Sequence, residues 1–450
     1  MLKIGTRLFA CALLGLVLLP ASALQAQTST PWKWGPVLGL AGDGLVVLSW
    51  ETTRPVSIDL HYGLTQVHRG SGSWDETLTF DRQEGRAEIW LRDLVPSESY
   101  RYQLIAYEGD AVYPTALEDF RAPADSVRTL SFTVYGHTRS FPDRHKLVAD
   151  TIRDTEADAD FVAHVGGLVE SLSPDRMANF FWAIADLGRT TPYVTVVGSK
   201  TENEAAYYDA FALPRGGGIA DEQWWSFDYG PVHVIGLDST LTDPADTAAQ
   251  EQLAWLRQNL ASAAGGLIVV LISDALYGGA YPSGRNEALI TLWEPVFREH
   301  GVSVVFGASS GAYEHVYASG IHHVTTGGGG GPLAERPQTA PPGLVFSRYG
   351  ILHYIRITVA DDALRAEAVP IASIIEDEVY LTPSARPIDS FVVRAMGTDL
   401  HRRRRYRPIS QRRLPLDAIP SPSRTRRAQA CPQRNAPPAV REASGRDARI

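Results

Sequence analysis

The feature that most constrains the fold of this chain is a change of hydrophobic pattern at Pro123. Residues 31–123 contain short runs of alternating apolar residues, such as LVVLSW at 45–50, and turn-forming residues separate these runs at short, regular intervals. This spacing is typical of a β-sandwich. After Pro123 the apolar runs alternate with amphipathic segments, which indicates a buried sheet covered by helices. The sequence therefore predicts an all-β sandwich at 31–123, followed by an α/β domain at 124–398.

Apolar runs after Pro123 predict the strands of the buried sheet: 129–136, 160–167, 192–198, 233–239, 267–273 and 302–308. Between them, Leu253, Leu256 and Leu260 share one helical face, so we expect a helix over 252–260. Short strands resume from about 350 to 394 and close the sheet. Because loops on a rigid scaffold carry most functional groups, we expect the site at the strand ends.

The first 27 residues have the pattern of a secretory signal peptide. Lys3 and Arg7 precede an apolar run at 8–19 that is too short to span a bilayer, and small residues follow it. We place the cleavage site within 23–27 and expect export to the periplasm or the extracellular space. No later stretch has the apolar length of a membrane helix. The two cysteines, Cys11 and Cys431, lie in the signal peptide and the tail, so the mature body has no disulfide or thiolate metal site.

Charge is unevenly distributed along the chain. Of 42 Lys and Arg and 51 Asp and Glu in all, residues 401–450 hold 14 Arg, no Lys and three acidic residues. The tail thus carries a net charge of +11, which leaves −20 for residues 1–400. Because an acidic surface repels phosphate groups, we expect no nucleic-acid binding by the body of the protein.

The C-terminal tail, residues 399–450, contains a four-arginine run at 402–405 and is dominated by Arg, Pro, Ser and Ala. With few aromatic residues it cannot form a core, and we expect a disordered tail. Attachment to nucleic acid or to a membrane surface is a second interpretation, and a tail without function is a third. The sequence does not identify a partner for it.

A first resemblance lies in the N-terminal sandwich. Residues 94–102 (LVPSESYRY) resemble the corner of fibronectin type III domains, in which a tyrosine ties a loop back to the start of a strand. Tyr100 takes that position, and Trp50 corresponds to the core tryptophan of an earlier strand. The resemblance gives both residues a structural role in core packing.

A second resemblance covers 31–395, nearly the whole mature body. The phrases VYGHTRS (134–140), FVAHVGGLVES (161–171), PYVTVVGSKTEN (192–203) and GVSVVFGASSGAYEHV (301–316) resemble the purple acid phosphatase branch of the calcineurin-like metallophosphoesterases. The resemblance implies a four-layer αββα sandwich after the β-sandwich. It also implies phosphoester hydrolysis by two metal ions, such as Fe, Zn or Mn, that polarise phosphoryl oxygens and activate a bridging water.

The positions that correspond to the family's ligands and catalytic residues are, however, substituted. They are occupied here by His137, Gly167, Ser199, Lys200, Ser273, Ser309 and Gly311. A neutral serine is a poor ligand for hard divalent cations, glycine offers no side chain, and Lys200 places a positive charge where the metals would sit. We therefore predict no dinuclear centre and no bound cofactor.

Other groupings of residues could still supply chemistry. Residues 307–311 (GASSG) match the G-x-S-x-G motif of serine hydrolases, but the following residues do not open a helix as a nucleophile elbow requires. A single-metal site built from His137, His164 and Asp274 is a further hypothesis. We favour neither of them.

Several remaining motifs favour structural roles. His164, His233 and the pair at 322–323 lie inside strand patterns, so we interpret them as hydrogen-bonded structural histidines. The glycine run at 327–331 lacks the Lys-Ser or Lys-Thr of a phosphate loop, so we expect a flexible turn.

The sequence thus predicts an exported, catalytically silent protein of this fold. The small residues at the ligand positions should leave a polar cleft with Lys200 and Arg139 as its cations, and we hypothesise that it binds a small anion such as phosphate or a phosphoester. The alternative interpretation is that Lys200 only fills space and reaches solvent. Two alternatives stay open: an active metal-dependent phosphoester hydrolase with non-standard ligands, and a degenerate gene product without a selected role.

Overall fold

Two mixed β-sheets organise the chain in the computed structural model. It describes residues 29–42, 45–124, 129–198, 205–263, 266–281, 283–308, 310–382 and 386–395. The signal peptide and the basic tail expected from the sequence, together with Ser199, Lys200 and Ser309, lie outside these residues.

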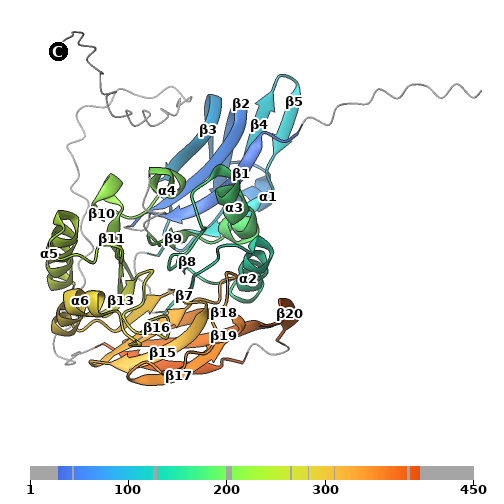
Figure 1. Ribbon diagram of the computed structural model, residues 1–450. Helices are drawn as coiled ribbons and strands as arrows, with labels where there is room; N and C mark the ends of the chain where they lie inside the picture. The colour runs from blue at the N-terminus through green and yellow to red at the C-terminus, as the bar shows by residue number, and fades with distance from the viewer. Residues whose placement is uncertain are drawn as a thin grey trace, which may run out of the picture. The chain divides into compact units, whose positions relative to one another are not determined.

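The first sheet has a parallel centre and an antiparallel flank (Figure 1). Its centre consists of β7 (Thr129–Tyr135), β8 (Phe161–His164) and β9 (Tyr193–Thr195). Its antiparallel flank consists of β18 (Ile351–Ala360), β19 (Ala363–Ile375), β20 (Glu378–Leu381) and β21 (Asp389–Arg394).

The N-terminal strands continue this first sheet beyond β9. They are β1 (Trp32–Leu40), β2 (Val46–Leu64), β3 (Glu76–Leu91), β4 (Ser99–Glu108), β5 (Ala111–Pro114) and β6 (Glu118–Arg121), with the short helix α1 (Thr65–Ser71) after β2. Strand β1 pairs with β2 on one side and, at Gly39 opposite Tyr193, with β9 on the other. The segment before Pro123 therefore shares a sheet with the α/β segment after it.

Two predicted aromatic positions lie in the core of the N-terminal segment. Trp50 is fully buried. Tyr100 is also buried, and its hydroxyl oxygen accepts a hydrogen bond of 2.8 Å from the backbone N–H of Val95, which ties the preceding loop to the start of β4. Both side chains thus occupy the structural positions that the sequence predicts for them.

The second sheet contains the remaining strands of the α/β segment. In spatial order they are β10 (Gly216–Gly217), β11 (Trp224–Tyr229), β12 (Val232–Gly236), β13 (Leu267–Leu271), β14 (Val304–Gly307), β16 (Ile321–Thr326), β15 (Ala312–Ala318) and β17 (Leu344–Tyr349). The neighbouring strands β12, β13, β14 and β16 are parallel, so their carboxyl ends lie at one edge of the sheet.

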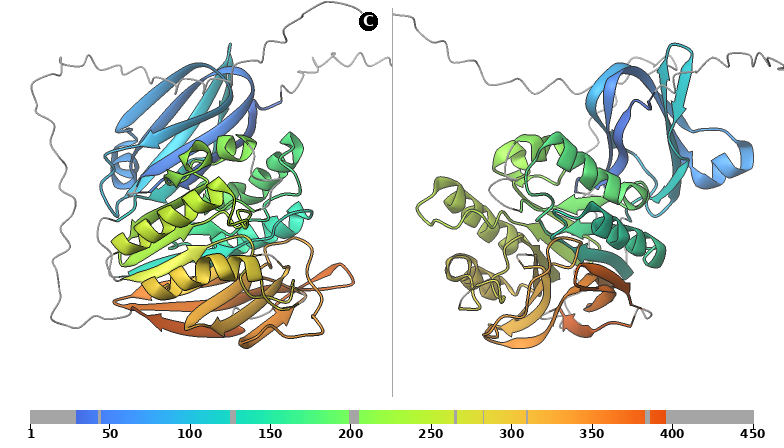
Figure 2. Two further views of the ribbon diagram at one scale, coloured as in Figure 1. Left: turned by 60° about the vertical axis from the view of Figure 1, so that its left-hand side comes forward. Right: turned by 45° about the vertical axis from the view of Figure 1, so that its right-hand side comes forward.

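Helices cover the outer faces of the parallel strands (Figures 1 and 2). They are α2 (Pro142–Thr155) and α3 (Pro174–Gly188) on the first sheet, and α5 (Thr247–Ser262) and α6 (Glu287–His300) on the second, with the short α4 (Ala205–Ala210) between them in sequence. Prolines open α2 and α3, where a missing N–H costs nothing. Asp246 and Asn286 cap α5 and α6 with their side chains. No described helix has the length and apolarity needed to cross a membrane.

Successive side chains of the second sheet point alternately to its two faces and pack into two different cores. In β13, Val269 and Leu271 join the core shared with the first sheet, whereas Ile268 and Val270 join a core that contains Leu256 of α5 and Trp293 of α6. A strand buried on both faces reads as a continuous apolar run, as observed in the sequence. The α/β segment is therefore a layered sandwich of the predicted kind, with two sheets between two helical layers.

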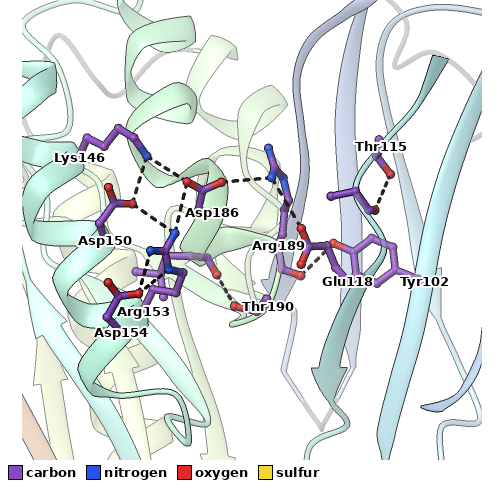
Figure 3. Close-up of polar contacts among 12 residues, drawn as sticks. Tyr102, Thr115, Glu118, Lys146, Asp150, Arg153, Asp154, Asp186, Arg189 and Thr190 are labelled. Carbon is purple, nitrogen blue, oxygen red and sulfur yellow. Dashed lines mark hydrogen bonds and ion pairs between the residues drawn. The ribbon is translucent and has the colours of Figure 1, made fainter. Parts of the chain in front are cut away.

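A polar network joins α2 and α3 to the N-terminal strands (Figure 3). Lys146 of α2 contacts Asp186 of α3 at 3.1 Å, and Asp186 in turn pairs with Arg189 at 3.2 Å. Arg189 extends to Glu118 of β6, and its backbone carbonyl accepts a hydrogen bond of 2.9 Å from the buried Tyr102 hydroxyl of β4. Side-chain contacts thus reinforce the strand pairing between β1 and β9.

All six strands expected after Pro123 are present, but each of them ends before the predicted apolar run does. Strand β8 ends at His164 rather than 167, because Gly166 and Gly167 have φ of +78° and +66°, a left-handed conformation that breaks the ladder. The predicted helix over 252–260 lies within α5.

Candidate functional site

The carboxyl ends of parallel strands from both sheets meet at the positions where the site is expected. A Cβ atom added to Gly166, after β8, would lie 2.5 Å from the Ser273 hydroxyl oxygen, after β13. One added to Gly136, after β7, would lie 2.8 Å from the Cβ of Ala308, after β14. Small residues at the strand ends therefore let the two sheets touch directly.

The glycine run at 327–331 is a buried bridge between the sheets rather than the flexible turn that we expected. Gly327 N–H donates to the carbonyl of Ala312 in the second sheet, and Gly329 N–H donates to that of Gly136 after β7, both over 2.9 Å. Cβ atoms on these glycines would collide with backbone at less than 2.5 Å. Glycine is required here because a side chain would prevent the backbones from approaching so closely. The sequence does not reveal this requirement, because a glycine run is equally typical of a flexible turn.

His137 is held as a neutral side chain between this bridge and the end of β8. Its ring Nε2–H donates 3.0 Å to the Pro332 carbonyl, so Nδ1 carries the lone pair, and that atom is buried with no hydrogen-bond partner among the described residues. Burial and the nearby Arg139 guanidinium lower the pKa of His137 to about 4. Gly167 faces the same ring, because its Cβ would lie 3.5 Å from Nδ1.

Asp274 supplies a partly buried carboxyl group after β13. The Ser239 hydroxyl donates to its Oδ2 over 3.4 Å, and the Asp274 N–H donates to the same hydroxyl oxygen over 2.9 Å. Burial, assisted by the nearby Asp238, raises the pKa of Asp274 to about 6, although Ser239 and Arg139 oppose the shift. The group can exchange a proton in mildly acidic conditions.

A small pocket lies beside the strand ends, on the side of α2 and α3. It encloses about 350 Å³ of empty space, including its open mouth. Its charged lining comes from Arg139 after β7, Glu170 after β8 and Arg176 in α3. The other lining residues are Thr138, Ser140, Pro142, His145, Leu168, Val169, Asn179 and Phe180. Gly167, Ser273 and Gly311 do not line it, so the described cavity is displaced from the predicted ligand positions.

Arg139 is the charged lining group of this pocket that has no fixed side-chain partner in the described part of the chain. Its side chain is half-buried, and it makes no ion pair or side-chain hydrogen bond with any residue that the structure describes. Its backbone N–H donates to the Gly167 carbonyl over 3.3 Å, which fixes the loop. The guanidinium therefore has free donors for an anion at this position.

The hypothetical single-metal site is wrong. His164 donates or accepts a hydrogen bond with the Thr138 hydroxyl at 3.2 Å, His137 points to Pro332, and Asp274 pairs with Ser239. Across the described residues, no group of three or more His, Cys, Asp or Glu could hold a metal ion.

The structure also shows the surroundings of the histidines predicted to be structural and of the G-x-S-x-G motif. His233 is a hydrogen-bonded structural histidine, with Asp228 and Asn259 each 2.7 Å from a ring nitrogen. His322 likewise bonds His315 at 2.9 Å. The prediction is wrong for His323, because both its ring nitrogens are buried without a hydrogen-bond partner among the described residues. After the G-x-S-x-G motif the chain enters strand β15 rather than a helix, so the element that a nucleophile elbow requires is missing there.

Comparison with known proteins identifies the architecture. The chain is similar to the purple acid phosphatase PPD1 of yellow lupin (Lupinus luteus) seeds, with a TM-score of 0.65 and 16% identity over 80% of this chain and 74% of that one. It is also similar to PhoD, with a TM-score of 0.62 and 14% identity over 82% of this chain and 91% of that one. The chain has the fold of the calcineurin-like metallophosphoesterases. No family model matches the sequence, and no curated protein matches it significantly.

The metallophosphoesterase fold does not by itself supply the chemistry of the family. At the predicted ligand positions that the structure describes, His137 is the one side chain with a metal-binding nitrogen, and Gly167, Ser273 and Gly311 offer no charged donor. Ser199, Lys200 and Ser309 lie outside the described residues, and none is a carboxylate or imidazole. The donor set therefore does not fit a pair of metal ions.

Sequence reasoning identified Arg139 but missed the rest of the pocket. Arg176 and Asn179 lie on α3, where an exposed polar residue has the same local pattern whether or not it faces a cavity. Ser140 has a φ of +78°, a backbone conformation that is rare for a residue with a side chain. The sequence around Ser140 does not indicate this conformation. Glu170 follows the ligand position at Gly167 by three residues, which was the one available signal.

Proposed function

We propose that this chain is a catalytically silent protein of the metallophosphoesterase fold that binds a small anion, such as phosphate or a phosphoester, at the Arg139 pocket. The observation that carries the proposal is the half-buried guanidinium of Arg139, which lacks an ion pair among the described residues and lines a cavity at the strand ends. An arginine in this setting presents a rigid fork of donors that matches an oxyanion. Lys200 is a second proposed cation for the same anion.

The substitutions at the predicted ligand positions support the proposal that the protein is catalytically silent. Hydrolysis by the family's chemistry needs two cations to stabilise the developing charge and to activate water. The positions where such cations would be held carry glycine, serine and lysine here. His137, neutral and turned to Pro332, cannot replace them alone.

Isothermal titration of inorganic phosphate into the purified protein tests the proposal. We expect binding by the wild type and a loss of affinity of about 10- to 100-fold in Arg139→Gln, because hydrogen bonds to charged groups are the strong ones. Arg394→Gln is the matched control, since Arg394 is exposed and pairs with Asp362 at 3.3 Å in another part of the fold. Equal affinities in wild type and Arg139→Gln contradict the proposal.

Turnover of p-nitrophenyl phosphate distinguishes the alternative of an active hydrolase. Chelator-sensitive turnover together with stoichiometric Mn, Fe or Zn would establish that alternative. We further propose export through residues 1–27 and a fibronectin III-like N-terminal domain at 31–123, for which the Tyr100 contact with Val95 is the support.

A further inference from the structure

The anion pocket already contains an anion of the chain itself. The carboxylate of Glu170 accepts hydrogen bonds from the Ser140 hydroxyl through one oxygen and from the Arg176 guanidinium through the other. All three residues line the pocket with Arg139. Two donors of this pocket, the Ser140 hydroxyl and the Arg176 guanidinium, therefore converge on an oxyanion in the structure as it stands.

The surrounding backbone fixes these donors in place. Thr138 N–H and Arg139 N–H both donate to the Gly167 carbonyl, at 2.9 and 3.3 Å, so the loop after β7 is held against the loop after β8. This contact positions Ser140 beside Glu170. Arg176 lies in the first turn of α3, whose apolar face, including Phe180, packs into the core.

The side chain of Glu170, in contrast, can move. The preceding Leu168 and Val169 are buried and anchor the backbone, but the Glu170 side chain is 32% exposed and that of its partner Arg176 is 46% exposed. Ion pairs with this exposure contribute little to stability, so their exchange costs little. Rotation about the side-chain bonds of Glu170 moves its carboxylate into solvent without a change of backbone.

We propose that Glu170 is a built-in competitor that sets the affinity of this pocket for small oxyanions. An incoming phosphate or phosphomonoester binds Arg139, which has no side-chain partner among the described residues, and takes the Ser140 and Arg176 donors from the Glu170 carboxylate, which turns outward. The inference rests on the proposed function, and it adds how occupancy of that site is controlled.

Competition has a specific electrostatic signature. With Glu170 in place, the described lining of the pocket offers two guanidinium groups and one carboxylate, which sum to +1; without the carboxylate charge the sum is +2. An anion that binds within a few ångströms of the carboxylate position gains affinity when that negative charge is removed, by about tenfold at a half-exposed site. A purely structural Glu170 would give the opposite result, because its loss would loosen Ser140 and Arg176.

Titration calorimetry with inorganic phosphate at low ionic strength tests the proposal in the full chain. Glu170→Gln retains the size of the side chain and removes its charge, and we expect phosphate affinity about tenfold above wild type. The matched control is Glu287→Gln, which removes a carboxylate from an exposed pair with Arg285 in α6, and we expect wild-type affinity. Thermal unfolding of each variant establishes that it is folded.

A second pair of variants separates the two proposals. Arg176→Gln should weaken phosphate binding, and Glu170→Gln/Arg176→Gln should lose most of the gain of the single Glu170 variant. If wild type binds phosphate and Glu170→Gln binds it equally or more weakly, the competitor is refuted and the proposed function stands. If neither folded protein binds phosphate, both proposals fall.

Discussion

Replacing Gly166 by alanine tests whether the two sheets touch at their strand ends. The residue has a φ of +78°, and an added Cβ would lie 2.5 Å from the Ser273 hydroxyl oxygen and 2.9 Å from the Gly198 Cα. The left-handed backbone costs an alanine roughly 1 kcal/mol, and overpacking of a buried contact adds about 1–3 kcal/mol. We therefore expect Gly166→Ala to lower the free energy of unfolding by about 2–4 kcal/mol.

Urea denaturation followed by tryptophan fluorescence measures this loss, and Gly85→Ala is the matched control. Gly85 has a φ of +76°, nearly the same conformation, but nothing lies within 4 Å of its added Cβ. It should lose only about 1 kcal/mol. In Gly166→Ala/Ser273→Gly part of the penalty should disappear, because the clashing side chain is gone. A loss in Gly166→Ala no larger than that in Gly85→Ala would refute the direct contact.

The remaining predictions concern pH, the N-terminal contact and helix capping. Burial lowers the pKa of His145 to about 3 and that of His353 to about 4, so the unfolded chain binds more protons than the folded one below about pH 6.5. The contribution of these two neutral histidines to the free energy of unfolding is fully present above that pH, and it should fall towards pH 4 by up to about 1.4 kcal/mol per pH unit for each histidine. The urea midpoint of His145→Gln should therefore decline less steeply with falling pH than that of the wild type. Tyr102→Phe removes the hydrogen bond to the Arg189 carbonyl and should cost about 1 kcal/mol in urea unfolding; no change would show that the contact is unimportant. Asp246→Ala removes the side-chain cap of α5 and should also cost about 1 kcal/mol, whereas Asp246→Asn should retain most of it.

The layered architecture could be predicted from the sequence because it depends on local patterns. The apolar runs that form β13 and β14 are buried on both faces, and continuous apolar sequence is what such strands require. The strand ends were less accessible, because the apolar pattern continues past them. Val165 is as buried as the strand before it, and only the left-handed glycines that follow mark the end of β8.

The candidate site could be predicted only in part. Its place at the strand ends and the residue Arg139 follow from position in the chain, since each lies directly after a strand. The pairing of Glu170 with Arg176 depends instead on how α3 packs against the sheet, which no local pattern specifies. The glycine run at 327–331 shows the same limit, because identical residues serve a flexible turn and a closely packed bridge.

The metal content of the purified mature protein, measured by elemental mass spectrometry after equilibration with Mn, Fe and Zn, tests the central claim most directly. Our account predicts far less than one ion per chain, because none of the seven predicted ligand positions carries a carboxylate and His137 alone among them carries an imidazole. Two tightly held ions per chain would contradict it.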